Sequence, residues 1–348
     1  MQRIIDLRSD TVTLPTPRMR EAMYRAELGD DVFGEDPTVN RLQEMAAERL
    51  GKEAGLLVVS GTMGNLVSLL THCGRGDEVV MGDRAHTFLF EAGGASALGG
   101  IHVRTVPNQP DGTIRPADVV AAIRGDNVHF PRSRLVCLEN THNRCSGAAL
   151  SPAQMESVAA VARAHGLRVH LDGARIFNAA VALGLPAREL AAVADSVSFC
   201  LSKGLSAPVG SVICASKAFI AEARRQRKVV GGGMRQAGII AAAGIVALEE
   251  MIDRLAEDHA HARLLAEAIA EIPGLAIDPP PVLTNIVIFE VTDPRLTPQE
   301  LSRRLLARGV KINPTEGRSL RAVTHYGIER TDVEQAIRVL RQVMQAAA

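Results

Sequence analysis

Residues 196–210, SVSFCLSKGLSAPVG, place one lysine between a short apolar run and a glycine-containing turn. Apolar residues alternate with small ones from Val197 to Leu201, a pattern typical of a buried strand, and Ser202-Lys203-Gly204 ends it. Lys203 is therefore predicted to lie at a strand end, where α/β sheets bind their ligands. A partly desolvated lysine can attack a carbonyl as a free amine, so Lys203 is a candidate nucleophile. A surface lysine in a turn is the alternative.

Seven short apolar runs, this one included, alternate with segments of helical periodicity. The predicted strands are Leu56–Ser60, Glu78–Gly82, Ile101–Val106, Leu135–Glu139, Val169–Asp172, Val197–Leu201 and Val209–Cys214. Helices are predicted over Arg18–Glu27, from Pro37 to Gly51, and over Pro152–His165 and Arg188–Ala194. This alternation predicts an α/β fold with a large, mainly parallel seven-stranded sheet that carries helices on both faces.

The chain changes character near residue 250. Helical periodicity runs from about Met234 to Ile272, becomes charged at Glu249, and is followed by the proline-rich stretch Asp278–Pro281. Beyond it, strands are predicted over Ile286–Val291, Val310–Asn313 and Leu320–Thr324, and helices over Pro298–Arg308 and Thr331–Ala346. We therefore expect an N-terminal arm plus large α/β domain over 1–250 and a small α+β domain over 251–348.

The overall composition excludes several classes of protein. The 348 residues include 39 basic and 39 acidic ones, a balance that suggests neither a nucleic-acid nor an acidic-membrane partner. The five cysteines contain no C-x-x-C pair, which favours reduced thiols in a cytoplasmic protein over disulfides or a zinc site. No secretory signal is apparent, and the apolar run Gly238–Leu248 is too short to span a membrane. No metal site is predicted.

Two further strand ends carry groups that bind ions. Ser60–Asn65 follows a strand and opens a helix, so its backbone N–H groups and the Thr62 hydroxyl can bind an anion; a tight turn without a ligand is the alternative. Asp172 ends another strand, where an acid can hold a cationic ring nitrogen, and the Arg175 fork can bind a carboxylate. The alternative is a helix-capping Asp paired with Arg175. Pyridoxal phosphate needs such an anion site, an acid and a lysine together.

Several other residues are weaker candidates. His86 follows a strand, where an imidazole can stack on a cofactor ring or exchange protons, and His129 is a second such histidine. Arg321, on a predicted strand of the small domain, would face a cleft if the two domains close over a substrate. The turn Gly231–Arg235, with Lys228 upstream, can approach a phosphate or merely join two helices.

Seven motifs, taken together and in order, resemble those of the L-threonine aldolases, in particular the low-specificity bacterial type. The motifs are Asp6–Thr11 (DLRSDT), Gly29–Thr38 (GDDVFGEDPT), Ser60–Asn65 (SGTMGN), Glu139–Asn143 (ENTHN), His170–Arg175 (HLDGAR), Leu201–Gly204 (LSKG) and Gly231–Gln236 (GGGMRQ). The resemblance runs over nearly the whole chain. It implies the aspartate-aminotransferase fold, fold type I, of pyridoxal-phosphate enzymes.

The resemblance also implies how the cofactor is held. The residues implied to contact pyridoxal 5'-phosphate are Gly61, Thr62, His86, Asp172, Arg175, Lys203 and Arg235. Among them, Lys203 would form the Schiff base, Asp172 would pair with the pyridine nitrogen, and His86 would stack on the ring. Gly61 and Thr62 would bind the phosphate.

A second set of residues is implied to bind the substrate. It consists of Ser9, His129, Arg175, Lys228 and Arg321. Ser9, Arg175 and Arg321 would grip the carboxylate, and His129 would lie near the β-hydroxyl. Lys228 and Arg235 would reach a neighbouring subunit's site, which implies a dimer and usually a tetramer formed by two such dimers. Phe33 stands where the family often has Tyr, so a hydroxyl contact made elsewhere is in doubt here.

The implied activity is that of an aldehyde lyase. Threonine or allo-threonine would be cleaved to glycine and acetaldehyde, and the reverse addition would also occur. The group that takes the β-hydroxyl proton stays open between His86, His129 and a bound water. Alternatives are a β-eliminating lyase or an aminotransferase on the same scaffold, and a non-catalytic binding protein.

Overall fold

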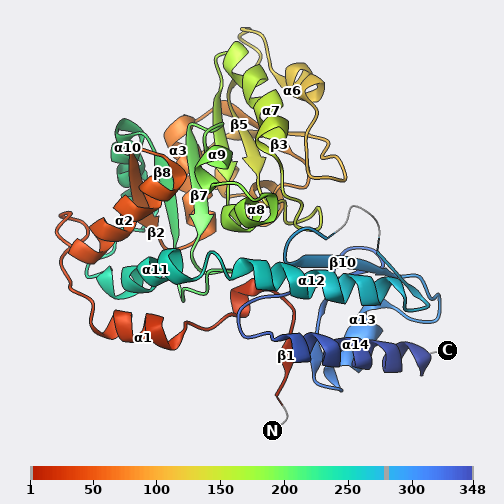
Figure 1. Ribbon diagram of the computed structural model, residues 1–348. Helices are drawn as coiled ribbons and strands as arrows, with labels where there is room; N and C mark the ends of the chain where they lie inside the picture. Colours follow the sequence, from red (N-terminus) through yellow and green to blue (C-terminus); the bar gives the residue numbers. More distant parts are fainter. Residues whose placement is uncertain (1–2, 278–281, 347–348) are drawn as a thin grey trace.

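The computed structural model describes residues 3–277 and 282–346, so the proline-rich stretch 278–281 lies outside the described residues. Its main feature is a seven-stranded sheet in the order β2-β8-β7-β6-β5-β3-β4 (Figure 1). These strands are β2 (Ala54–Val58), β3 (Asp77–Gly82), β4 (His102–Val106), β5 (Arg132–Glu139), β6 (Arg168–Asp172), β7 (Ser196–Cys200) and β8 (Ser211–Ala215). All seven predicted strands are present, and the predicted α/β fold class is confirmed.

One strand, β8, runs antiparallel to both of its neighbours, β7 and β2. The reason lies in the connection between Cys200 and Ser211, which contains no helix. A parallel return needs a crossover of a dozen residues or more, usually a helix, so this shorter link reverses the chain. The other strands run parallel, and their carboxyl ends therefore meet at one edge of the sheet.

Helices cover both faces of the sheet because successive side chains of each strand point to opposite faces. On one face, α3 and α10 pack Val67 and Ala223 against Leu56 and Ile213. A larger core on the other face includes Leu57 and residues of α2, α7, α8 and α11. The helices of this part are α1 (Pro17–Tyr24), α2 (Pro37–Leu50), α3 (Gly61–His72), α4 (His86–Leu89), α5 (Gly94–Ala97), α6 (Pro116–Ala122), α7 (Pro152–Ala164), α8 (Ile176–Leu183), α9 (Ala187–Ala191), α10 (Lys217–Val229) and α11 (Gly238–Glu250), with a short 3-10 helix at Asp10–Val12.

The C-terminal part contains a four-stranded antiparallel sheet in the order β12-β13-β10-β9. Its strands are β9 (Leu275–Ala276), β10 (Ile286–Val291), β12 (Asn313–Pro314) and β13 (Ser319–Val323), and its helices are α12 (Leu255–Ala270), α13 (Pro298–Leu306) and α14 (Arg330–Gln345). The N-terminal strand β1 (Ile5–Asp6) crosses to this part and pairs in parallel with β11 (Val310–Lys311). Ile5 and Leu7 are accordingly buried in the same core as Phe289 and Leu340.

Two predicted elements differ from the structure. The helical pattern from Met234 to Ile272 is not one helix, because α11 ends at Glu250 and α12 begins at Leu255. The interruption lets α11 pack into the core of the large sheet while most of α12 packs into the C-terminal core. The predicted strand Val310–Asn313 is also divided, since β11 pairs with β1 whereas β12 pairs with β13. The division of domains at residue 250 stays a prediction.

All five cysteines, Cys73, Cys137, Cys145, Cys200 and Cys214, are free thiols in buried positions.

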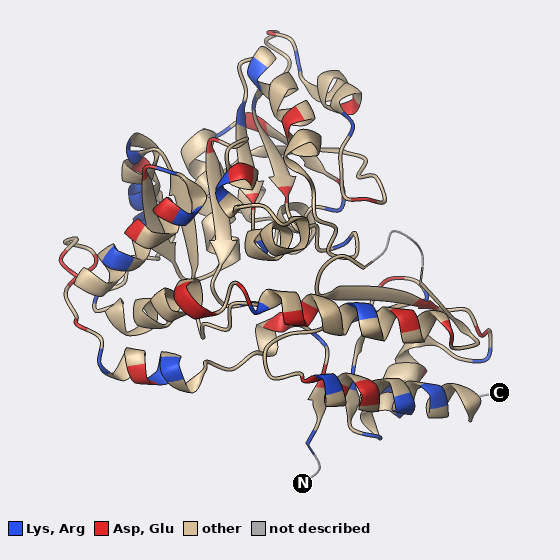
Figure 2. Ribbon diagram, viewed as in Figure 1, with Lys and Arg blue, Asp and Glu red and all other residues tan. Residues whose placement is uncertain are grey.

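Acidic and basic side chains are interspersed along the helices, with both signs on α12 and α14 (Figure 2). None of the helices in the described part of the chain combines the length and apolar character needed to cross a membrane.

Candidate active site

The turn from β2 into α3 presents backbone N–H groups at the carboxyl edge of the large sheet. Ser60 caps α3, and its Oγ accepts a hydrogen bond of 3.2 Å from the N–H of Met63. The N–H groups of Gly61 and Thr62, in the first turn of the helix, have no partner within α3. A Cβ on Gly61 would lie only 2.8 Å from the Sγ of Cys200, so the close approach of α3 to β7 requires glycine. The result is a helix start with free N–H groups, a geometry that suits an anion.

Asp172, at the end of β6, is buried in a network of donors. Its Oδ2 accepts a hydrogen bond of 2.8 Å from the side-chain amide of Asn65, and its Oδ1 accepts one of 3.1 Å from the N–H of Ala174. The amide of Asn65 is oriented by Ser198, whose hydroxyl donates to the Asn65 Oδ1 at 2.6 Å. Asp172 is thus held at the sheet edge with its carboxylate oxygens in defined directions.

His86, at the start of α4, lies in the same network. Its Nδ1 is 2.9 Å from the Oε1 of Glu91, and its backbone N–H donates to Glu139 at 2.7 Å. Burial alone would lower the pKa of His86, but the hydrogen bond to Glu91 and the charge of Asp172 outweigh it and raise the pKa above its ordinary value. Burial raises the pKa of the Glu91 carboxyl.

His86, Glu91 and Asp172 also form a group of possible metal ligands. Their ligand atoms lie within 4.8 Å of one another. However, the Asn65 amide donates to both carboxylates, at 2.7 Å and 2.8 Å, and a positively polarised N–H group is unfavourable beside a cation. We therefore interpret the group as a hydrogen-bonded network, and the absence of a metal stays a prediction.

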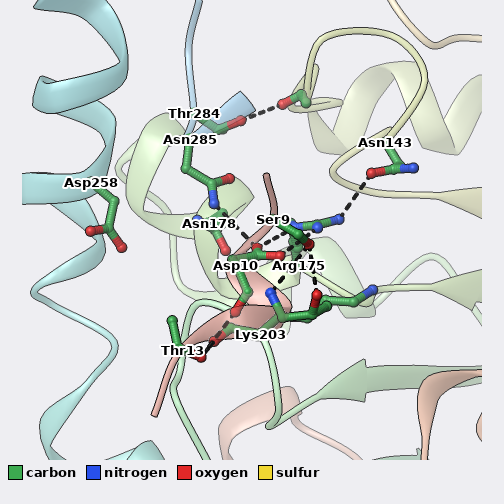
Figure 3. A network of polar contacts seen from close by, with 12 residues as sticks. Ser9, Asp10, Thr13, Asn143, Arg175, Asn178, Lys203, Asp258, Thr284 and Asn285 are labelled. Carbon is green, nitrogen blue, oxygen red and sulfur yellow. Dashed lines mark hydrogen bonds and ion pairs between the residues drawn. The ribbon is translucent and has the colours of Figure 1, made fainter. Parts of the chain in front are cut away.

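Lys203 lies in the turn after β7 and is half-buried. Its backbone oxygen accepts a hydrogen bond of 3.3 Å from the Thr13 hydroxyl, so the N-terminal segment lies directly against this turn. Burial alone would raise the pKa of the Asp10 carboxyl, but the charge and hydrogen bonds of Arg175, with the charges of Lys203 and Arg321, hold it well below its usual range. Figure 3 shows Ser9, Asp10, Arg175 and Lys203 grouped at the centre of this network.

Arg175 and Arg321 form a pair of guanidinium groups beside the lysine. Arg175 binds Asp10 with two hydrogen bonds of 2.6 and 2.7 Å. Both arginines also donate to the side-chain oxygen of Asn143, at 3.4 Å from Arg175 and 2.9 Å from Arg321. The Nε of Arg321 has no hydrogen-bond partner among the described residues. Burial and the charge of Arg175 lower the pKa of Arg321 to about 10. Two cations that share one neutral oxygen favour the binding of an anion.

Ser9 lies at the end of the arm that carries Asp10 (Figure 3). Its hydroxyl caps the short helix that begins at Asp10 and accepts hydrogen bonds from the N–H and the hydroxyl of Thr11, at 3.2 and 2.9 Å. The structure thus brings together Ser9, the α3 start, His86, Asp172, Arg175, Lys203 and Arg321.

His129 is placed elsewhere in this chain. It is exposed and precedes the first residue of β5, Arg132, which pairs with Asp77 at the beginning of β3. His129 therefore lies beyond the amino edge of the parallel strands, whereas Asp172 and Lys203 lie at the carboxyl edge. A role for His129 stays a prediction and requires a neighbouring copy of the chain.

Lys228 and Arg235 are also exposed. They flank a glycine turn in which Gly232 is so close to Met63 that a Cβ would lie 2.5 Å from the methionine sulfur. Met63 belongs to the first turn of α3, so this turn borders the anion site. The Nη1 of Arg235 lies 2.9 Å from Asp30, in the loop that also carries the exposed Phe33.

Sequence reasoning missed the partners that hold these residues. The missed residues are Asp10, Asn65, Glu91, Glu139 and Asn143. For Asp10 a signal was available, since an acid in a short segment beside apolar residues needs a cation when the segment is buried. Glu91 had none, because its contacts with Asn65 and His86 arise only from the tertiary fold.

A comparison with protein families places this chain in a known group. The model of the beta-eliminating lyase family matches residues 6–294. The chain belongs to the beta-eliminating lyase family. Within it, the chain is 47% identical to low-specificity L-threonine aldolase 1 of Arabidopsis thaliana, over 99% of this chain and 97% of that protein. It is 45% identical to the low specificity L-threonine aldolase of Escherichia coli K12, over 95% and 97% of the two chains. The expected resemblance is confirmed.

Solved structures of other proteins share the fold of this chain. A threonine aldolase of Leishmania major superposes with a TM-score of 0.83 at 21% identity, covering 98% of this chain and 99% of that one. A putative L-allo-threonine aldolase of Listeria monocytogenes gives a TM-score of 0.80 at 20% identity, over 95% of each chain. At about 20% identity, these two superpositions establish the fold of this chain.

Proposed function

We propose that this chain is a pyridoxal-phosphate-dependent L-threonine aldolase, an aldehyde lyase that cleaves threonine and allo-threonine to glycine and acetaldehyde and catalyses the reverse addition. One observation carries the proposal: the Lys203 turn, the Asp172 carboxylate and the open start of α3 lie at one edge of one sheet. The 45% and 47% identity to low-specificity L-threonine aldolases over nearly the full chain supports the choice of reaction.

The residues present fit pyridoxal phosphate. The free N–H groups at Gly61 and Thr62 suit a phosphate, the buried Asp172 suits a protonated ring nitrogen, and the Lys203 amine suits an aldehyde. His86 would cover the ring from its position in the Asp172 network. When bound, the cofactor supplies an electron sink that stabilises a carbanion at the substrate's Cα.

The chain's own residues then bind and orient the amino acid. The substrate carboxylate would bind between Arg175 and Arg321, next to Ser9, and take over the role of shared acceptor that the Asn143 oxygen has now. Because Asp10 fixes two N–H groups of Arg175, this guanidinium is pre-oriented before the substrate arrives.

Two histidines are candidates to exchange a proton with the β-hydroxyl. His86 uses its Nδ1 for the hydrogen bond to Glu91, which leaves its Nε2 for this proton. His129 would act only from another copy of the chain. We therefore favour His86, directly or through a water.

We also propose a cytoplasmic homo-oligomer, a tetramer built as a dimer of dimers. Exposed apolar side chains such as Tyr24, Phe33 and Val229, which are 87%, 72% and 77% exposed, support an interface near the glycine turn with Lys228 and Arg235. The five reduced thiols support the compartment. Two separate hydrophobic cores support a division into domains at residues 1–250 and 251–348.

The decisive experiment is to supply pyridoxal phosphate and threonine and to assay glycine and acetaldehyde. We expect equal amounts of both, and no turnover in Lys203→Ala, whereas the exposed Lys217→Ala control keeps full activity. Transfer of the amino group to 2-oxoglutarate would indicate an aminotransferase instead, and pyruvate from serine a β-eliminating lyase. If Lys203→Ala turned over like the wild type, the proposal would be wrong.

A further inference from the structure

A cavity of about 510 Å³ adjoins the arginine pair. His86, Asn143 and Arg321 line it, and so do Phe90, Arg144 and Glu316. The first three belong to the site already described. The other three come from α4 and its end, from the loop after β5, and from the hairpin between β12 and β13. An amino acid bound by its carboxylate at Arg321 would therefore extend its side chain along a wall that includes Arg144.

Arg144 is a partly buried cation without a strong internal partner. Its side chain is only 17% exposed, and its guanidinium carbon lies 5.9 Å from the centre of the Phe90 ring. Its Nη2 lies 2.6 Å from the Oε2 of Glu316, whose side chain is 79% exposed. An ion pair with one partner so exposed to water contributes little, because water screens and replaces it readily. Glu316 is therefore a carboxylate that another carboxylate can replace.

The charges along the cavity are unbalanced. Arg144 and Arg321 both line this cavity, and the charge of Arg144 is one of the smaller causes that lower the pKa of Arg321, so the two like charges repel each other. Among the described residues that line the cavity, Glu316 is the one carboxylate, and it pairs with Arg144. A ligand with two carboxylates would neutralise both arginines at once, and the fork of Arg144 is suited to bind the second one with two hydrogen bonds.

We propose that Arg144 is a specificity residue that binds a carboxylate on the β-carbon of the substrate. This proposal rests on the threonine aldolase function proposed above. It adds β-hydroxy-α-amino diacids to the substrates of the same site, and 3-hydroxyaspartate is the simplest of them. The Cα–Cβ bond breaks, the β-hydroxyl loses its proton and becomes the aldehyde carbonyl, and Cα gains a proton. The products are glycine and glyoxylate, and no oxidant or reductant is consumed.

The test compares kcat/KM for L-threo-3-hydroxyaspartate with kcat/KM for threonine in the same holoenzyme preparation. In the wild type, we expect cleavage of both. Arg144→Gln should lower the ratio of diacid to threonine at least about tenfold, as expected for loss of hydrogen bonds to a charged group. Arg144→Lys, which keeps the charge but not the fork, should lower it less. Arg188→Gln, an exposed arginine at another surface, should leave the ratio and the threonine activity as they are.

Glu316→Gln provides a test that does not depend on removing Arg144. Because Glu316 competes with the substrate carboxylate, this variant should raise the ratio severalfold. Inhibition of threonine cleavage gives a binding readout: succinate should inhibit more tightly than butyrate, and Arg144→Gln should abolish the difference.

The outcomes separate the two proposals. A preparation that does not cleave threonine contradicts the aldolase function itself. If threonine is cleaved but the ratio is the same in wild type, Arg144→Gln and Glu316→Gln, the ion pair serves only to join the loop to the hairpin and the inference is wrong. It is equally wrong if succinate and butyrate inhibit the wild type alike.

Discussion

Two buried arginine–aspartate pairs have nearly the same closest N–O distance and burial, but they differ in hydrogen bonding and in their surroundings. Arg175 and Asp10 are 2.6 Å apart with side chains 4% and 0% exposed, and Arg227 and Asp31 are 2.7 Å apart with side chains 2% and 1% exposed. In each pair, the aspartate comes from the N-terminal segment. Arg175 is the N-cap residue of α8, and Arg227 lies on α10. Distance and burial alone do not distinguish them.

The surroundings give the two pairs opposite electrostatics. Burial lowers the pKa of both arginines, but at Arg175 the charge and hydrogen bonds of Asp10 outweigh burial and raise it. At Arg227, burial prevails and the repulsion of Arg224 adds to it, so the pKa is lowered despite Asp31. The Nε of Arg227 and the Oδ1 of Asp31 have no hydrogen-bond partner among the described residues.

The difference indicates two roles. The Arg175–Asp10 pair lies beside Lys203 and Arg321, and it leaves an excess of positive charge that suits a substrate carboxylate. The Arg227–Asp31 pair instead fastens the loop of Asp30 and Phe33 to α10, and Arg227 also donates to the backbone oxygen of Leu57 at 2.7 Å. These surroundings support the substrate-binding role proposed for Arg175, and for the second pair we infer a role in stability.

The largest effect is expected from Asp10→Asn. The amide keeps the shape of the carboxylate but presents an N–H group to one N–H of Arg175, so the guanidinium turns away and the carboxylate site is misplaced. We expect kcat/KM for threonine to fall by about 100-fold or more, since misplacement by about 1 Å has that effect. Steady-state kinetics measure this fall in kcat/KM, and a denaturation curve tests whether the variant is folded. If a folded Asp10→Asn enzyme had unchanged KM and kcat, the Arg175–Asp10 pair would have no role in substrate binding and would not differ in function from the Arg227–Asp31 pair.

Asp31→Asn tests the second pair, and we expect it to lower stability rather than substrate binding. Loss of one partner of a buried ion pair leaves an uncompensated charge and lowers the free energy of unfolding by about 3 kcal/mol or more. KM for threonine should change by less than about threefold, because Asp31 is not part of the arginine site. Urea denaturation, followed by kinetics on the folded holoenzyme, measures both quantities. A large rise in KM without loss of stability would reverse the two assignments.

The sequence predicts the sheet well because its signals are local. Short apolar runs locate every strand of the large sheet, and Pro37, Pro152 and Pro298 mark three helix starts. The break after Glu250 falls where the residues become charged, but this change does not by itself predict a break, which arises from the packing of α11 and α12 into different cores.

The candidate site is predictable only in part, because some of its residues have local signals and others are brought together only by the tertiary fold. Strand-end positions identify Asp172 and Lys203, because parallel strands bring such ends to one edge. The partner of Asp172, Asn65, is 107 residues away, and that of Arg175, Asp10, is 165 residues away. No periodicity or spacing links residues so far apart. The exposed position of His129 beyond the amino edge of the strands likewise follows from the tertiary fold and has no signal in its local sequence.

The smallest effect concerns a third buried pair, which pH can break. His142 is 1% exposed, and its Nε2 lies 3.9 Å from the Oε2 of Glu139, whose other oxygen accepts the N–H of Asn143 at 2.8 Å. Burial alone would lower the pKa of His142, but the charge of Glu139 outweighs it and raises the pKa from 6.5 to about 9. Protonated His142 therefore neutralises the acid that holds the Asn143 loop.

The sign of the pH dependence follows from this raised pKa. The stabilisation is complete below about pH 6.5, where His142 is protonated in both the folded and unfolded chain, and is lost as pH rises through about 9. The loss should be at most about 3 kcal/mol, and His142→Gln should remove this part of the slope. Urea denaturation of both proteins from pH 6 to pH 10 measures it. Equal slopes in wild type and His142→Gln would show that His142 is neutral, and Glu139 would then need another cation.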